Sequence, residues 1–213
     1  IVADPRRGDL ARHAKYFLQF KPDTDVALLN AMMHVIVHEG LVNEDFIRAR
    51  TIGYDDLKKN VAGYSPEAMA PVCGIPAETI KTVARVYAKS KGSMILWGMG
   101  ISQHIHGTDN ARCLIALCMM TGQIGRPGTG LHPLRGQNNV QGASDSGLIP
   151  MFLPDYQRVA NDDARARFEK LWNTTLDPKP GLTVVEIMDA VHAGTIRGMY
   201  IMGENPAMSD PDA

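Results

Sequence analysis

Apolar residues recur at helical spacing in one long segment of the chain, at Val26, Leu29, Met33, Ile36 and Val37. Asp23 or Thr24 is placed to cap the start of this segment, and Gly40 is placed to end it. The pattern therefore predicts an amphipathic helix over residues 25–39. Four shorter helical patterns follow and predict a helical layer, over residues 44–50, 55–60, 66–72 and 77–89.

A change of pattern comes after these helices. A short apolar run over residues 93–97 lies between Gly92 and Gly98, which predicts a buried strand. Residues 109–121 are nearly all apolar and stop at Gly122, which predicts a buried helix. The strand, the glycine turn and the helix together predict one α/β unit.

From Gly122 to Tyr156 the sequence has neither helical nor strand periodicity and is rich in Gly, Pro and amide side chains. A connection of this length inside a compact domain is normally functional or disordered, and its composition favours function. Beyond it, the pattern predicts helices over residues 162–172 and 184–193 and a last strand over 198–202. The alternation of helices and strands predicts the α/β class.

Charge and hydropathy argue against two kinds of partner. The 213-residue chain has 22 Lys and Arg against 23 Asp and Glu, so it lacks the basic field that holds a nucleic-acid backbone. No apolar run approaches the roughly 20 residues of a membrane helix, and no signal peptide opens the sequence. We expect a cytoplasmic protein with no nucleic-acid binding and no membrane insertion. The first residues lack Met and look like the end of a buried strand, so we also expect a segment of a longer protein.

Cysteines and histidines give little sign of a metal site. The three cysteines, at 73, 113 and 118, fit neither a disulfide framework nor a CxxC pair, which favours buried thiols. His34 and His38 have the spacing of two helical zinc ligands. Val35 stands where the HExxH motif needs Glu, so a helix-surface or core pair is favoured. His104 and His106 follow the glycine turn at Gly98. Either both are hydrogen-bonded loop residues, or one of them faces a ligand.

Three predicted strand ends run into Gly, Asp or Asn, at Asp4, Gly98 and Gly203. In open α/β sheets ligands bind beyond the carboxyl ends of strands, where backbone N–H groups approach phosphates. The pattern fits either a nucleotide-bearing ligand or ordinary strand-to-helix turns. A full GxGxxG motif is absent, because Gln103 stands at the place of its third glycine.

Arg135 stands between Leu134 and Gly136 in a stretch of otherwise neutral polar residues. Its guanidinium offers a planar pair of N–H donors that matches a carboxylate, so it is a candidate anchor for a small acid. An ordinary surface arginine is the alternative.

Two stretches, residues 95–100 and 132–145, closely resemble the catalytic subunit of molybdenum- or tungsten-dependent formate dehydrogenases. Further stretches resemble that family in the same order along the chain, at residues 4–6, 21–28, 121–128 and 203–206. The wider molybdopterin oxidoreductase family, periplasmic nitrate reductases included, shares several of these turns. The run Arg-Gly-Gln-Asn-Asn-Val-Gln-Gly at 135–142 resembles the formate enzymes in particular.

The resemblance implies a fold and a division of the chain. The fold would consist of Rossmann-like three-layer α/β/α units, present in part. Residues 1–134 would be the second part of a Rossmann-like domain with its helical layer. Residues 135–213 would hold the glycine- and amide-rich cofactor loop and part of a second α/β domain.

The resemblance also implies a bis(molybdopterin guanine dinucleotide) cofactor with Mo or W. By similarity, Asp4 and Arg6 would lie at a guanosine end. The guanine or its ribose would meet Asp23, Thr24 and Asp25, although relatives often have Gly in place of Asp23. The remaining residues that match cofactor contacts are Met99, Gln103, Gln137 and Asn205.

In the same resemblance, Arg135 matches the arginine that holds formate beside the metal while formate is oxidised to CO2. The metal-ligating Cys or selenocysteine and the four-cysteine motif of a 4Fe-4S cluster find no match, so we expect both elsewhere in the parent subunit. Expected partners are the rest of that subunit and electron-transfer subunits, and we expect no turnover from the chain alone. The alternatives are a non-catalytic nucleotide-binding or interaction module of the superfamily, or another member such as a nitrate reductase.

Overall fold

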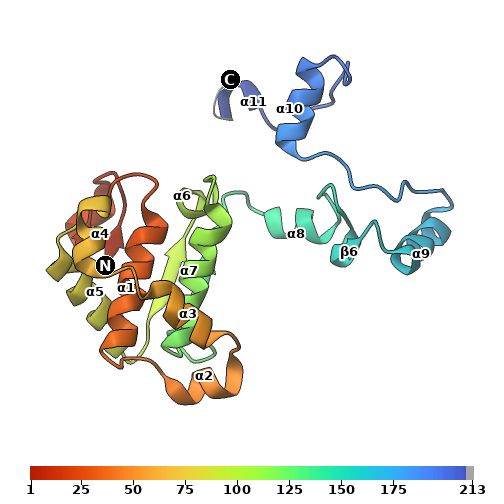
Figure 1. The fold of residues 1–213 in the computed structure, drawn as a ribbon. Coiled ribbons are helices and arrows are strands. Elements are labelled where there is room, and N and C mark those ends of the chain that lie inside the picture. The colour runs from red at the N-terminus through yellow and green to blue at the C-terminus, as the bar shows by residue number, and fades with distance from the viewer. Residues whose placement is uncertain (210–213) are drawn as a thin grey trace. The chain divides into compact units, whose positions relative to one another are not determined.

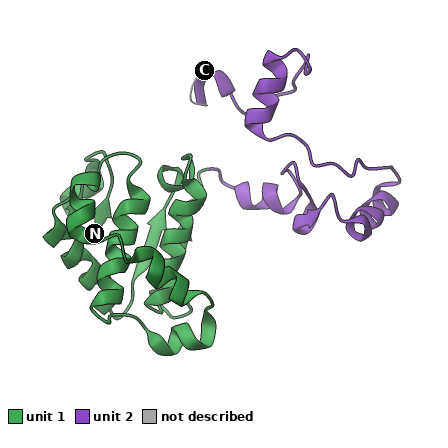
Figure 2. Ribbon diagram, in the orientation of Figure 1, with its two compact units in different colours: residues 1–136 green, residues 137–213 purple. Residues whose placement is uncertain are grey.

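The computed structural model describes residues 1–209 as a helix-rich α/β chain (Figure 1). The chain divides into two compact units, Ile1–Gly136 and Gln137–Ala213 (Figure 2). Each unit is described separately below. The assignment of the two parts to domains of a larger enzyme stays a prediction.

Five helices in unit 1 confirm the helical pattern of the first half of the chain. Their bounds are α1 Asp25–His38, α2 Glu44–Arg50, α3 Tyr54–Val61, α4 Pro66–Cys73 and α5 Ala77–Lys89. Local signals set several of their ends. Asn43 accepts a hydrogen bond from the Phe46 N–H at the start of α2, and Gly74 ends α4 in a left-handed conformation.

The core of unit 1 forms around α1, which packs against α3, α4, α5 and α7. All five of these helices contribute fully buried side chains, among them Ile36, Val61, Ile80 and Val83. All three cysteines are free and buried, as expected from their spacing. Burial of apolar surface is the main favourable term in folding. Because α1 contacts four other helices of this core, it contributes to most of that burial.

Unit 1 holds two separate pairs of parallel strands. β1 Val2–Ala3 pairs with β2 Phe17–Leu18, and the short 3-10 helix η1 Asp9–His13 lies between them in sequence. The predicted strand over residues 93–97 is observed as β3 Met94–Trp97, and it pairs with β4 Gly130–Pro133. The one-turn helix α6 Met99–Ser102 and the buried helix α7 Gly107–Met120 connect β3 to β4.

Two expectations for the strands of this unit were wrong. The aperiodic stretch from Gly122 onward was expected to be all loop, but it contains β4, because pairing with a distant strand needs no periodicity of its own. The first residues were expected to lie in a buried strand. β1 has one partner strand among the described residues, and Ile1 is 52% exposed.

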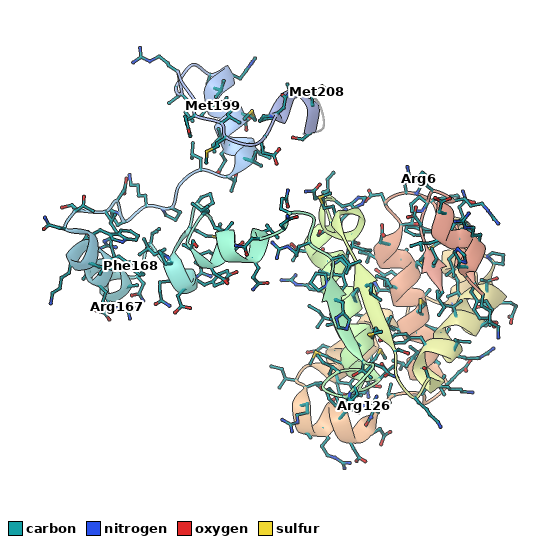
Figure 3. The ribbon with its side chains drawn as sticks, turned by 180° about the vertical axis from the view of Figure 1, so that it is seen from behind. Arg6, Arg126, Arg167, Phe168, Met199 and Met208 are labelled. Carbon is teal, nitrogen blue, oxygen red and sulfur yellow. The ribbon has the colours of Figure 1, made fainter. Side chains whose placement is uncertain are left out.

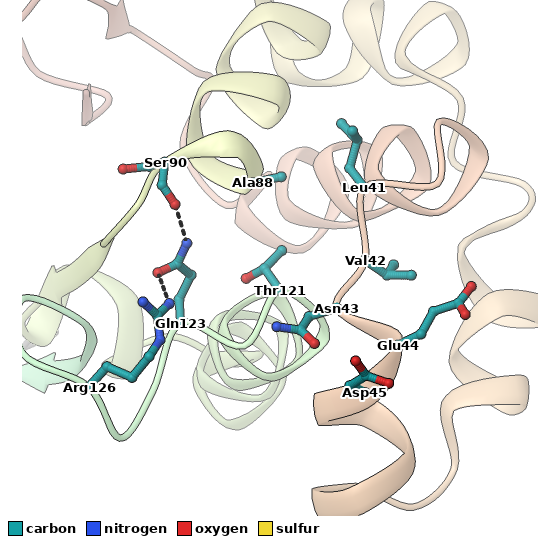
Figure 4. A pocket seen from close by; sticks show the side chains of 10 residues that line it. All are labelled: Leu41, Val42, Asn43, Glu44, Asp45, Ala88, Ser90, Thr121, Gln123 and Arg126. Carbon is teal, nitrogen blue, oxygen red and sulfur yellow. Dashed lines mark hydrogen bonds between the residues drawn. The ribbon is translucent and has the colours of Figure 1, made fainter.

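The residues between α7 and β4 fix the amino ends of β3 and β4 (Figure 4). The Gln123 side chain is buried, accepts from the Ser93 N–H at 3.0 Å and donates to the Ser90 carbonyl at 2.9 Å. The Arg126 guanidinium donates to the Lys91 carbonyl at 2.9 Å and to Gln123 Oε1 at 3.1 Å. These side chains replace the water that the backbone groups before β3 would otherwise need.

Unit 2 consists of short elements: α8 Val140–Asp145, β5 Phe152–Leu153, η2 Pro154–Tyr156, β6 Gln157–Arg158, α9 Asp162–Trp172, α10 Val184–His192 and α11 Pro206–Ser209. α9 and α10 confirm the two helices predicted there, and both have side-chain caps. Asn161 accepts from the Ala164 N–H at 2.9 Å, while Thr183 and Glu186 form a reciprocal capping box. β5 and β6 pair as an antiparallel ribbon.

The strand predicted over residues 198–202 is not observed. A strand needs a neighbour for its backbone hydrogen bonds, and the described part of the chain gives this segment none. Its side chains are exposed, Tyr200 to 88% and Met202 to 79%. Met199 and Met208, labelled in Figure 3, extend this exposed apolar surface. Among residues 1–209, no helix has the length and apolar character to cross a bilayer.

Candidate functional site

The parallel pairing of β3 with β4 brings two candidate residues to one edge. Trp97 lies opposite Pro133, so Met99 and Arg135 each follow two residues after a paired position. The Leu134 N–H donates to the Trp97 carbonyl at 2.6 Å and extends this alignment past the strands. Arg135 is exposed and has no ion pair or side-chain hydrogen bond with any other described residue. Its guanidinium is therefore free to bind an anion.

The loop after β3 is held by its own backbone and by the start of α7. The Gln103 N–H donates to the Met99 carbonyl at 2.8 Å, and buried Asn110 donates to the Ile101 carbonyl at 2.9 Å. A Cβ on Gly107 would lie 2.0 Å from the Ser102 carbonyl oxygen, so glycine is required there. Backbone and side-chain hydrogen bonds thus hold the loop that presents Met99 and Gln103, although both of these side chains are exposed.

The turn before α1 carries three further candidates. Asp23 has φ +65°, a left-handed conformation that glycine adopts most easily and that aspartate tolerates. Thr24 donates its hydroxyl to the Lys21 carbonyl at 2.7 Å, and the Lys21 N–H donates to the Cys73 carbonyl at 2.8 Å. The end of α4 therefore supports the turn.

Asp25, the first residue of α1, has the chemistry of a nucleotide-binding carboxylate. It is only 5% exposed, and burial raises the pKa of its carboxyl, while its own backbone N–H and His104 oppose that rise. The amino end of α1 has no side-chain cap. The buried carboxylate is therefore a hydrogen-bond acceptor at a helix start that has no side-chain cap.

Asp4 and Arg6 follow β1 directly. The Arg6 N–H donates to Asp4 Oδ1 at 2.7 Å, which closes a tight turn around Pro5. Both side chains are exposed, and Arg6 is labelled in Figure 3. The first of the three expected strand ends therefore exists, as does the second after β3. The third was wrong, since the described part of the chain has no strand over residues 198–202, directly before Gly203.

Two candidates lie in unit 2, apart from the others. Gln137 is its first residue, and the Asn205 backbone carbonyl accepts from Met208 at the start of α11. Both side chains are exposed. Within unit 1 the β3–β4 register aligns Met99 with Arg135, and the roles of Gln137 and Asn205 stay predictions.

His34 and His38 lie on the surface side of α1, one of the two arrangements that the sequence favoured, and His104 is a hydrogen-bonded loop residue as favoured. The His34 and His38 rings stack with centroids 4.1 Å apart, and His34 Nδ1 donates to the Val61 carbonyl at 2.8 Å. His104 bonds the Gly100 carbonyl and lies near Asp23, a contact that sequence spacing did not reveal. No cluster of three metal-binding side chains occurs in the described residues.

A hollow of about 630 Å³ in unit 1 is lined by none of these candidates (Figure 4). It is lined in part by Gln123 and Arg126, which precede β4, whereas the candidates follow β3 and β4. The Arg126 guanidinium is already bonded to backbone carbonyls. We therefore do not assign the cofactor to this hollow.

Helices packed against small parallel strand pairs define a helix-rich α/β protein, and its strand ends present polar side chains. Comparison with known families agrees with that class. The family model for molybdopterin oxidoreductase matches residues 1–213, so the chain belongs to the molybdopterin oxidoreductase family. That family implies a pterin cofactor with Mo or W in the parent enzyme.

Formate dehydrogenase subunits are among the similar curated proteins. The chain is 45% identical over 212 residues to the F420-dependent formate dehydrogenase subunit alpha of Methanocaldococcus jannaschii, covering 100% of this chain and 31% of that protein. It is 41% identical over 213 residues to formate dehydrogenase H of Escherichia coli, covering 100% of this chain and 30% of that protein. The chain thus spans about a third of the length of these relatives.

A solved structure supports the fold. Acetylene hydratase from Pelobacter acetylenicus matches with a TM-score of 0.58 and 27% identity, covering 60% of this chain and 18% of that chain. The mixed α/β arrangement with small parallel sheets therefore has a counterpart in a solved structure.

Proposed function

We propose that this chain is a segment of the catalytic subunit of a formate dehydrogenase that oxidises formate to CO2 at a bis(molybdopterin guanine dinucleotide) centre with Mo or W. The observation that carries the proposal is the β3–β4 pairing, which presents Arg135 beside Met99 with no competing partner among the described residues. Similarity to formate dehydrogenase subunits over the whole chain supports the substrate.

In this proposal Asp25 accepts N–H groups of a guanine, and Asp23 and Thr24 shape the turn around it. Asp4 and Arg6 bind a guanosine end, and the dinucleotide is also contacted by Met99, Gln103, Gln137 and Asn205. A buried carboxylate is well suited to this task, because hydrogen bonds to a charged acceptor are stronger in a low-dielectric site.

Arg135 holds the formate carboxylate through two parallel N–H donors and so orients its C–H bond. The bound metal group supplies the acceptor for the hydrogen and electrons that leave formate. The product CO2 has no negative charge, so it loses the charge-assisted pairing with the guanidinium and departs. Arg135 thereby favours substrate over product in binding.

The wider assignment follows from the same proposal. The two units belong to Rossmann-like three-layer α/β/α domains of a larger subunit, which also carries a 4Fe-4S cluster and the Cys or selenocysteine ligand. That subunit is cytoplasmic and passes its electrons to electron-transfer subunits. The isolated 213-residue chain has no formate turnover. It also has no four-iron cluster, because such a cluster takes four thiolates and the chain has three cysteines.

The test is substitution of Arg135 in the full-length subunit. Arg135→Lys keeps the charge but loses the paired donors, and Arg135→Ala loses both, so kcat/KM for formate should fall in that order. We expect the alanine variant to lose at least about 100-fold, as for loss of a charge-assisted substrate contact. Molybdenum or tungsten content should stay near the wild-type value.

Controls separate substrate binding from cofactor binding. Arg50→Ala removes an exposed arginine at the end of α2 and should change neither quantity. Asp25→Asn should lower metal and guanine content together with activity. If Arg135→Ala empties the site of metal, its role is cofactor binding, and normal formate kinetics in that variant would refute the substrate assignment.

One alternative has a specific observation behind it. The chain is 34% identical over 215 residues to the assimilatory nitrate reductase catalytic subunit of Bacillus subtilis. Nitrate-dependent oxidation of a reduced dye by the full-length subunit, without formate-dependent reduction, would favour that activity. A subunit that binds no metal would favour the non-catalytic module.

A further inference from the structure

His104 lies in the loop after β3 and approaches the turn before α1, and the proposed function assigns cofactor contacts to both segments. It directly follows Gln103 in the loop after β3. The helices that follow the two loops, α1 and α7, pack against each other. Asn30 in the second turn of α1 and Cys113 in the second turn of α7 meet there, with Sγ 3.8 Å from Oδ1. This packing brings the loops before the two helices together.

Both ring nitrogens of His104 face acceptors. Nε2 lies 2.7 Å from the Gly100 carbonyl oxygen, which accepts a hydrogen bond, so Nε2 carries a proton. This bond closes the loop on itself and fixes the orientation of the ring. Nδ1 lies 3.5 Å from Asp23 Oδ1 in the turn before α1, and this contact is an ion pair when the imidazole carries a proton on both nitrogens. Within residues 1–209, this contact between His104 and Asp23 is the one ion pair or hydrogen bond that joins residues 98–106 to residues 21–25.

We propose that His104 is a positioning residue that holds the loop after β3 against the turn before α1, so that Gln103 and Asp25 face one ligand. The identity of that ligand as a guanine nucleotide rests on the proposed function, whereas the tie between the loops rests on the contacts above. His104 also favours the ionised form of buried Asp25, and burial opposes that form. A carboxyl group must be ionised to accept one N–H group on each of its oxygens. His104 therefore both holds the two segments together and favours the form of Asp25 that accepts.

Hydrogen exchange tests the tie without reference to activity. In the full-length subunit prepared without cofactor, His104→Ala should speed amide exchange about two- to fivefold in peptides covering residues 99–106 and 21–27, as expected for a partly exposed ion pair. His106→Ala is the matched control, because its exposed side chain has no hydrogen bond or ion pair with any described residue. It should leave both peptides unchanged.

Asp23→Asn removes the charge on the other side of the contact and keeps a residue that tolerates the left-handed backbone. It should reproduce faster exchange in residues 99–106. If it does not, or if His104→Ala behaves like His106→Ala, the tie is refuted. Should His104→Ala fail to fold, His104→Gln keeps a donor toward Gly100 and provides the same comparison.

Guanine content supplies the second measurement. The GMP released by acid hydrolysis of purified subunit should fall about two- to fivefold for His104→Ala and Asp23→Asn, and not for His106→Ala. The KM for formate of the loaded fraction should stay unchanged, unlike that of Arg135 variants. Unchanged GMP content would overturn the positioning role. Absence of formate turnover in the wild type would instead refute the proposed function and leave the exchange result to decide the tie.

Discussion

Residues 1–136 and residues 137–209 differ in how they bury apolar side chains. The first region has a continuous core in which Ile36 and Ile80 are completely buried. In the second, Leu153 and Ala164 are the buried apolar residues among those described. Large side chains stay exposed there, with Val185 at 66% and Tyr200 at 88%. The helices of the first region are stabilised mainly by packing, and those of the second mainly by local capping.

This difference separates two sources of helix stability. Isolated helices of about ten residues are marginal in water, and packing of an apolar face normally provides the missing free energy. α1 receives that packing from four other helices. α10 has a complete capping box at Thr183 but little burial of its valines. Substitutions in the core and at the cap should therefore lower the free energy of unfolding by different amounts, and the effect of a cap substitution should stay within its own helix.

The largest expected effect is on the core. Ile36→Ala should lower the free energy of unfolding by about 2–5 kcal/mol, because it removes a completely buried side chain and leaves a cavity. Val185→Ala, at an exposed position of α10, should stay within about 0.5 kcal/mol. Urea unfolding followed by circular dichroism measures both. Equal losses would show that the two regions are stabilised in the same way.

A smaller effect is expected at the buried amide before β3. Gln123→Ala leaves the Ser93 N–H and the Ser90 carbonyl without their side-chain partner and should cost about 1–3 kcal/mol. Gln141→Ala removes an exposed amide in α8 and should cost less than about 0.5 kcal/mol. The same urea series reports both. If Gln123→Ala left the free energy of unfolding unchanged, water would be replacing the hydrogen bonds of the side chain.

The smallest and most local effect is expected at the cap of α10. Thr183→Ala removes one half of the capping box and should cost about 1 kcal/mol of helix stability. Amide protection in residues 184–192 should fall about fivefold, while protection in α1 stays unchanged. Thr195→Ala, an exposed threonine beyond the helix, is the control. Loss of protection in α1 would contradict the local character of this stability.

Local signals made much of the fold predictable. The helix predicted over residues 162–172 is observed with the same bounds, because Asn161 caps it and its pattern is complete in one short segment. α5 likewise matches its predicted bounds of 77–89. Strands were less predictable, because β4 is specified by its pairing with β3 rather than by its own residues. The segment over residues 198–202 has the composition of a strand but no partner in the described chain.

Local signals in the sequence also made part of the candidate site predictable. Asp25 and Arg135 were identified from motif and chemistry, and their cofactor and substrate roles stay predictions. The sequence could not show that His104 and Asp23 meet, because they are far apart in the chain and only the packing of α1 on α7 joins them. Gln123 looked like any amide in a glycine-rich stretch until its burial was known.

The parallel pairing of β3 with β4 also sets an order in which this part of the chain folds. Pro133 follows Trp97 by 36 positions, and closing a segment of that length costs on the order of 3 kcal/mol in chain entropy. Four paired positions offer little compensation until α7 has formed and docked on α1. Helices form in about a microsecond and contacts between distant strands form more slowly. We therefore expect Met99 and Arg135 to become neighbours late, after the helical core has assembled.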